Sequence, residues 1–258
     1  MDNRAKKRLV DENIRLCKFG VYKKLTGPKS TKKFYDDNFN IAPPFEFCTV
    51  DTSMSHPLDT AYEYLCKGFK PIVVNLVSPE YTYEGTYSFT GFHDEMIYFR
   101  TNISLFLEGF SLFPLADSES LYTPTVHIIR NSDLMVLHTD EAAKCKLSLI
   151  TSALRSNPPL VKSNLNIEDY HNTKYLLETI FQTAYNAQND VLILPDFGCV
   201  HDKYPIDDII DLINGCIYKY GHLFKYVIVS IFVSSQATMG YFNKFKSKLV
   251  KPQDFLHD

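Results

Sequence analysis

The sequence predicts an α/β fold in which strands and helices alternate around a mostly parallel sheet. Short apolar, β-branched runs are bounded by proline or glycine, which is typical of strands buried on both faces. Stretches with helical apolar spacing separate these runs along most of the 258 residues. Ligands of such sheets bind beyond the carboxyl ends of the strands, so we expect the loops after Val77 and Leu194 to face one cleft.

The first half of the chain is expected to supply two strands and three helices. In chain order these are a helix at 4–17, a strand at 45–50, a helix at 57–66, a strand at 71–77 and a helix at 93–107. Ser55 is expected to open the second helix and Gly68 to close it. The run 71–77 is the predicted central strand, and only Asn75 interrupts its apolar side chains.

The second half continues the alternation. Strands are expected at 125–129, 147–152, 191–194 and 226–233, and helices at 168–188, 205–219 and 236–248. The segment Asn157-Pro158-Pro159 is predicted to be an irregular insertion, because strand and helix signals continue on either side of it. No linker or repeat divides the chain. We therefore predict one domain over 1–258, with a helical extension at 1–44 and an α/β core at 45–258.

Composition and charge indicate an ordinary globular protein. Hydrophobic residues make up 45% and charged residues 22%, with a formal net charge of -3. Lysine and arginine crowd the first 35 residues, which we interpret as a solvated basic face rather than a nucleic-acid arm. The six cysteines lie far apart, without metal-ligand spacing, and predict reduced thiols in a cytoplasmic or nuclear protein. No metal, cofactor or membrane span is expected.

Four ordered motifs resemble one known family. They are Val73-Val74-Asn75-Leu76-Val77-Ser78-Pro79 with His93-Asp94-Glu95-Met96-Ile97, then Leu121-Tyr122-Thr123-Pro124-Thr125-Val126, then Val191-Leu192-Ile193-Leu194-Pro195-Asp196-Phe197-Gly198-Cys199-Val200, and last 224–233 with 241–245. Their order and spacing resemble the microbial-type poly(ADP-ribose) glycohydrolase branch of the macrodomain fold. The resemblance implies a three-layer α/β/α domain with a mixed, mostly parallel sheet.

The chain departs from that family at both ligand loops. In place of three consecutive glycines the first loop has only Gly85 and Gly91, and Gln-Glu-Glu is replaced by His93-Asp94-Glu95. In the second loop Val200 stands where the family has glycine. His201 and Asp202 follow it, so that an acid lies where a diphosphate would be repelled.

The resemblance implies a catalytic role for two acids. Glu95 matches the family's second glutamate, the acid/base that protonates a departing ribose hydroxyl. Asp94 matches the preceding glutamate and is expected to anchor the ribose, with a reach shorter by one methylene. The alternative is that both are ordinary acids that favour a helix N-terminus through the macrodipole.

The remaining site residues are expected to contact the ligand. They are Asn75, Gly85, His93, Phe197, Gly198, Cys199, Val200, His201 and Phe242. Gly198 with the amides of Cys199 and Val200 is the predicted phosphate loop, and a plain strand-exit turn is the alternative. Asn75 is assigned to ribose contact or loop support, because burying an amide is costly unless it is hydrogen-bonded. His93 as a solvated helix cap and Phe242 as a core residue remain open alternatives.

Three functions follow from the resemblance. The first is a macrodomain that recognises ADP-ribose and hydrolyses O-glycosidic bonds of poly(ADP-ribose) or ADP-ribosylated protein through Glu95. The second is a catalytically degenerate module that binds ADP-ribose or a related nucleotide. The third is a protein-interaction domain that uses the aromatic-rich loop from Tyr81 to Phe92.

Overall fold

The computed structural model describes residues 1–41, 44–45, 48–77, 92–107, 113–116 and 118–251, without the side chains of residues 92–94. Its main sheet contains β1 (Thr31–Lys33), β2 (Thr49–Ser53), β3 (Pro71–Val77), β4 (Ser120–His127), β5 (Lys146–Ala153), β8 (Val191–Leu194) and β9 (Tyr226–Ser230), and a separate hairpin contains β6 (Leu160–Val161) and β7 (Asn164–Leu165). The α-helices are α1 (Asn3–Lys18), α2 (Pro57–Cys66), α3 (Phe92–Arg100), α4 (Thr139–Lys144), α5 (Ile167–Asn186), α6 (Ile206–Tyr220) and α7 (Gln236–Lys248). Two 3-10 turns occupy Ile103–Leu105 and Gly221–Leu223.

The seven main strands form one mixed sheet in the order β1-β4-β5-β3-β8-β9-β2. The five strands from β5 to β2 run parallel, whereas β4 and β1 are antiparallel to their neighbours. The predicted α/β class with a mostly parallel sheet is confirmed. Strand β3 lies at its centre between β5 and β8, and all of its side chains except that of Leu76 are buried. Its apolar run therefore forms because both of its faces are covered.

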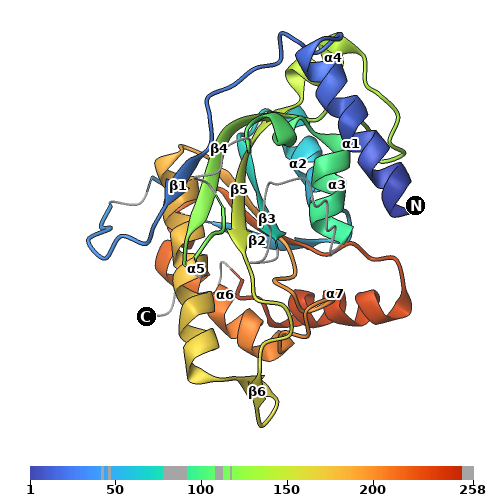
Figure 1. The fold of residues 1–258 in the computed structure, drawn as a ribbon. Helices are drawn as coiled ribbons and strands as arrows, with labels where there is room; N and C mark the ends of the chain where they lie inside the picture. Colours follow the sequence, from blue (N-terminus) through green and yellow to red (C-terminus); the bar gives the residue numbers. More distant parts are fainter. Residues whose placement is uncertain (42–43, 46–47, 78–91, 108–112, 117, 252–258) are drawn as a thin grey trace.

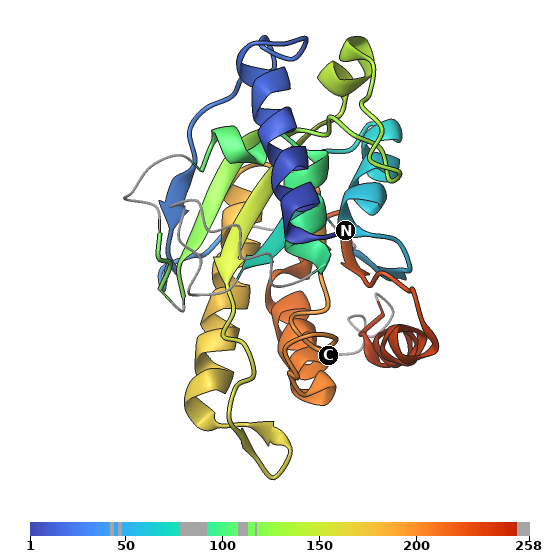
Figure 2. The same ribbon diagram turned by 45° about the vertical axis from the view of Figure 1, so that its right-hand side comes forward.

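Helices cover both faces of the sheet (Figures 1 and 2). Helices α5, α6 and α7 supply apolar side chains to the core on one face, and α1, α2 and α3 supply them to the core on the other. The carboxyl ends of β3 and β5 point downward in Figure 1, and the hairpin β6–β7 lies well below them at the bottom of the molecule. No described helix is long and apolar enough to cross a membrane.

The N-terminal 44 residues contribute to this architecture at two places. Helix α1 lies along α3, as both views show (Figures 1 and 2). Strand β1 pairs with β4, with Thr31 opposite Tyr122. The segment predicted as a helical extension therefore also contributes a strand to the edge of the sheet.

Several predicted boundaries are wrong for identifiable reasons. The strand expected at 45–50 is β2 at Thr49–Ser53, because pairing with β9 begins only at Thr49. His56, and not Ser55, caps α2: its Nδ1 accepts a hydrogen bond from the Leu58 amide at 3.2 Å. Pro57 occupies the first helical position, which fixes the cap at the residue before it. Strand β9 stops at Ser230, short of the predicted residue 233.

The helix expected at 93–107 and the strand expected at 125–129 also differ from the structure. Helix α3 ends at Arg100, whose carbonyl accepts a hydrogen bond from the Ile129 amide at 2.8 Å, and the chain then turns through a 3-10 helix. Strand β4 begins at Ser120, so the motif 121–126 lies within a strand and is not a turn leading into one. Its register shifts between Thr123 and Val126, around a proline that cannot donate a ladder hydrogen bond.

Candidate functional site

The candidate site lies at the carboxyl edge of the parallel strands β3, β5 and β8. The loop after β8 is described as far as α6, whereas residues 78–91, between β3 and α3, lie outside the described residues. Gly85, expected to contact the ligand, and most of the proposed interaction loop 81–92 belong to that undescribed segment. The described site therefore consists of three strand ends, the loop after β8 and the start of α3.

Asn75 provides an unpartnered polar group inside this edge. It is 1% exposed, and neither its side-chain oxygen nor its nitrogen has a hydrogen-bond partner among the described residues. Thr151 stands opposite it on β5, is also buried, and its hydroxyl likewise lacks a described partner. Asn75 is two residues from Val73, which packs on the core beneath α3, so its side chain faces that same layer. Buried polar groups are normally satisfied, which makes this pair a candidate ligand contact.

The loop after β8 makes a tight turn with two consecutive left-handed residues. Phe197 has φ +47° and Gly198 has φ +76°. The Gly198 carbonyl then accepts hydrogen bonds from the amides of Asp202, at 2.8 Å, and Tyr204, at 3.3 Å. Phe197 and Cys199 are both buried, so the loop is packed into the protein rather than extended from it.

Asp196 uses the amides that were predicted to hold a phosphate. Its carboxylate Oδ2 accepts a hydrogen bond from the Val200 amide at 2.7 Å, and its carbonyl accepts one from the Cys199 amide at 3.2 Å. Asp196 is itself almost fully buried. The turn is therefore closed by the chain's own carboxylate, which stands where an anionic ligand would bind to Val200. We correct the expectation that the Cys199 and Val200 amides are free for a phosphate.

The ionisable groups beside this loop hold their protons more strongly than usual, because they are buried. Burial and, to a smaller extent, the Asp196 carboxylate raise the pKa of Asp202, although a hydrogen bond with Ser156 opposes them. Burial raises the pKa of the Cys199 thiol well above its ordinary value, so Cys199 is not a thiolate nucleophile. His201 is exposed. The described residues include no group of three or more His, Cys, Asp or Glu side chains that could hold a metal ion.

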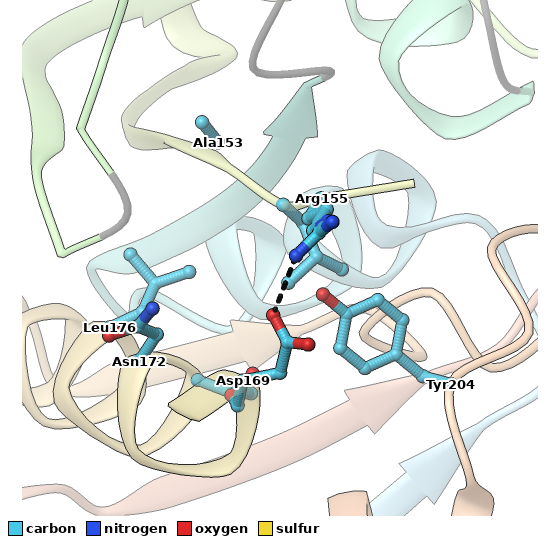
Figure 3. A pocket seen from close by; sticks show the side chains of 8 residues that line it. Ala153, Arg155, Asp169, Asn172, Leu176 and Tyr204 are labelled. Atoms are coloured by element: carbon cyan, nitrogen blue, oxygen red, sulfur yellow. Dashed lines mark hydrogen bonds and ion pairs between the residues drawn. The ribbon is translucent and has the colours of Figure 1, made fainter. Parts of the chain in front are cut away.

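A small cavity adjoins the loop at the end of β5 (Figure 3). Its volume is about 30 Å³, and Arg155, Asp169 and Tyr204 provide most of its polar groups. Arg155 Nη1 lies 3.5 Å from Asp169 Oδ1, and the Tyr204 ring stands beside this ion pair (Figure 3). The space fits one or two water molecules and is too small for a nucleotide.

Glu95 lies in the first half of α3 and forms an ion pair. Its Oε1 is 2.6 Å from the Lys6 Nζ of α1, and the two side chains are 13% and 18% exposed. His93 and Asp94 belong to the same helix, but their side chains lie outside the described residues. The structure therefore places Glu95 beside a cation that the sequence did not connect to it.

Phe242 lies in a different environment from the other predicted contacts. Phe242 lies on α7 and is buried in the same hydrophobic core as side chains of α5 and α6. The Lys246 ammonium lies 5.7 Å from its ring centroid. The core interpretation of Phe242 matches this placement. Lys6 and Asp196 were not among the predicted site residues. The only sequence signal for Asp196 was an acid shortly after a buried strand and just before Phe197-Gly198.

Comparison with solved structures gives a consistent match to this architecture. Poly(ADP-ribose) glycohydrolase from Thermomonospora curvata superposes with a TM-score of 0.74 at 12% identity, covering 94% of this chain and 100% of the other. The chain has the fold of the microbial poly(ADP-ribose) glycohydrolases. The T. curvata enzyme bound to the inhibitor ADP-HPD gives 0.71 at 14% identity, with 94% and 99% covered.

The enzyme from Deinococcus radiodurans in complex with ADP-ribose gives a TM-score of 0.67 at 14% identity, covering 81% of this chain and 87% of that one. No family model and no curated protein sequence matches the chain. The glycohydrolase fold is thus shared over nearly the whole chain, although few residues are identical. Asn75, Glu95 and the loop 196–204 all lie at the carboxyl edge of the sheet or in helix α3 beside it.

Proposed function

We propose that the protein binds ADP-ribose, either free or as a unit of an ADP-ribose polymer or a modified protein, at the carboxyl edge of its sheet. The buried pair of Asn75 and Thr151, whose side-chain polar atoms have no hydrogen-bond partner among the described residues, carries this proposal. An amide and a hydroxyl on adjacent strands can together donate to and accept from the hydroxyl groups of a ribose. Burying such groups without a hydrogen bond costs free energy, which a hydrogen-bonding ligand would recover.

The proposed ligand agrees with the fold comparison. The D. radiodurans enzyme of this fold is in complex with ADP-ribose, and the T. curvata enzyme is bound to the inhibitor ADP-HPD. Parallel α/β sheets bind ligands beyond the carboxyl ends of their strands. The unpartnered pair lies on two such strands.

Calorimetry with ADP-ribose tests this proposal. We expect measurable binding by the native chain and its loss in Val200→Glu, which adds a third carboxylate to a loop that already holds Asp196 and Asp202. Val161→Glu is the matched control, because Val161 is exposed on the hairpin β6–β7 and should bind as the native chain does. Absence of heat with millimolar ADP-ribose, together with no shift in the unfolding temperature, would contradict the proposal.

A second function, binding without turnover, is favoured by two contacts. A general acid must give a proton to the departing hydroxyl. A Glu95 carboxylate held by the Lys6 ammonium has none to give while the ion pair is closed. The Asp196 carboxylate, which already accepts the hydrogen bond of the Val200 amide, should also weaken binding of a diphosphate. The degenerate binding module is thus the form that we propose for the native chain. A turnover assay in which the native chain releases no more ADP-ribose than Glu95→Gln checks it.

Removing the charge of Asp196 should strengthen ADP-ribose binding. Asp196→Asn keeps the shape and an acceptor oxygen for the Val200 amide but removes a negative charge near the diphosphate. We expect the affinity measured by calorimetry to rise by about tenfold, which corresponds to about 1.4 kcal/mol. Asp190→Asn is the control, because Asp190 accepts a hydrogen bond from the Lys70 amide, at 2.6 Å, at the opposite end of β8. Equal affinity in the native chain and both variants would contradict this expectation.

A further inference from the structure

Helix α1 brings one cation to the candidate acid. Lys6 belongs to α1, which runs along α3 (Figures 1 and 2). Its ammonium contacts the Glu95 carboxylate at 2.6 Å, and both side chains are largely removed from water. Coulomb attraction at this separation is stronger than for an exposed pair, because less water screens it. The contact joins residues that are 89 positions apart in the sequence.

Toward its C-terminal end, α1 is hydrogen-bonded to α3 through the buried side chain of Asn13. The Asn13 side-chain nitrogen donates to the carbonyls of Tyr98, at 3.1 Å, and Phe99, at 2.8 Å, in the last turn of α3. The Asn13 oxygen accepts a hydrogen bond from the Arg130 guanidinium at 2.8 Å. Carbonyls in the last turn of a helix have no partner within it, so Asn13 satisfies groups that α3 leaves open.

The Asn13 and Lys6 contacts between α1 and α3 differ in burial. Asn13 is 1% exposed and belongs to a buried network, whereas Lys6 lies in the first turns of α1, next to exposed residues. They are two helical turns apart, roughly 10 Å. Helix termini open more readily than helix interiors. Opening at the Lys6 end of α1 would therefore break the ion pair with Glu95 while Asn13 still held the helix against α3.

We propose that Lys6 is a positioning residue that holds Glu95 as an ionised hydrogen-bond acceptor, so that the closed chain binds ADP-ribose without turnover and the opened chain hydrolyses it. This inference rests on the proposed function. In the closed form Glu95 can accept a hydrogen bond from a ribose hydroxyl but cannot supply a proton. In the opened form Lys6 no longer holds the Glu95 carboxyl group, which is then available as the proton carrier of the reaction.

The reaction of the opened form requires only water. The bond between the anomeric carbon and the departing oxygen breaks, and that oxygen takes the proton of the Glu95 carboxyl group. A water molecule adds its oxygen to the anomeric carbon and returns one proton to the Glu95 carboxylate. No metal ion or oxidant is needed. In this reaction Lys6 acts through the Glu95 carboxylate that its ammonium contacts.

Release of ADP-ribose from poly(ADP-ribose) tests the inference. We expect Lys6→Met to release ADP-ribose at least about tenfold faster than the native chain, since general acid catalysis contributes factors of this size or more. Lys6→Arg should behave as the native chain does, because the guanidinium restores the ion pair. Lys7→Met is the matched control, since Lys7 is the exposed neighbour on the same helix. Release equal to that of the native chain in Lys6→Met, or equal gain in Lys7→Met, would overturn the inference.

A double-mutant cycle on ADP-ribose affinity separates positioning from a purely structural role. We expect Lys6→Met to change the dissociation constant at least about threefold in the native background and to leave it unchanged in Glu95→Gln. A loosened α1 would instead alter both backgrounds equally, which would overturn the role through Glu95. If the native chain, Lys6→Met, Glu95→Gln and the double variant all bind ADP-ribose but Lys6→Met releases none from the polymer, only this inference is refuted. Binding by none of them refutes the proposed function as well.

Discussion

Gly198→Ala is expected to lower the free energy of unfolding by about 3 kcal/mol. Gly198 has φ +76°, a conformation that an alanine adopts only with strain. A Cβ at this position would lie 2.9 Å from both Leu154 Cδ2 and Tyr204 Cδ2, and 3.1 Å from Asp202 Cβ. Leu154 and Tyr204 are buried and cannot simply swing into solvent. The substitution therefore combines backbone strain with overpacking.

Gly215→Ala is the control for this prediction. Gly215 lies inside α6, and a Cβ there would meet no atom within 4 Å. Alanine has the higher helix propensity, so Gly215→Ala should raise stability by up to about 1 kcal/mol. Urea denaturation of both variants gives the comparison. A Gly198→Ala protein as stable as the native chain would show that the loop after β8 rearranges without cost.

Glu178→Ala is expected to cost about 3 kcal/mol of stability, because it removes the carboxylate that joins α5 to α6. Glu178 Oε2 accepts hydrogen bonds from the Lys219 ammonium and the Tyr220 hydroxyl, each at 2.9 Å. Glu178 is buried, and its loss would remove the acceptor of the Tyr220 hydroxyl proton, while the Tyr220 oxygen would still accept a hydrogen bond from Gln182 Nε2 at 3.3 Å. Glu168→Ala, an exposed change on the same helix, should cost about 0.5 kcal/mol or less.

The Glu178 contribution should also depend on pH. Burial acts to raise the pKa of Glu178, but hydrogen bonds from Lys219, Tyr220 and Tyr35 outweigh it, so the pKa in the folded protein is lowered. A lowered pKa stabilises the folded state above the ordinary glutamate range, and this stability is lost as the pH falls through the folded-state pKa. Denaturation between about pH 6 and pH 3 should therefore show a shallower loss in Glu178→Gln than in the native chain. Parallel curves would contradict the assignment.

Much of the fold could be predicted because burial and sequence pattern agree in the central elements. The bounds of β3 and β8 match the predicted strands 71–77 and 191–194, since both strands are buried on either face and end at turns. The edge strand β2 was placed too early. Five described residues of β2 pair with β9. Their register is set by this pairing and not by the local alternation of apolar and polar residues.

The site could be predicted only where a motif carried the information. Glu95 and Asn75 were singled out from the sequence, and the structure places one in an ion pair and the other in the sheet. The Lys6 contact spans 89 positions, and no local pattern encodes such a pairing. The Val200 amide was expected to be free for a phosphate. Its hydrogen bond to the Asp196 side chain, four residues earlier, could not be foreseen, because it depends on the backbone angles at Phe197 and Gly198.

The position of the N-terminal segment also determines how this protein can be assembled during synthesis. Asn13 forms hydrogen bonds with the carbonyls of Tyr98 and Phe99 and with the guanidinium of Arg130. Thr31 pairs with Tyr122 across strands β1 and β4. During synthesis, helix α1 must therefore wait for about a hundred further residues before its partners exist. Contacts so distant in sequence slow folding and leave early segments exposed. The contact that restrains Glu95 is consequently absent from a nascent chain and appears only when the domain closes.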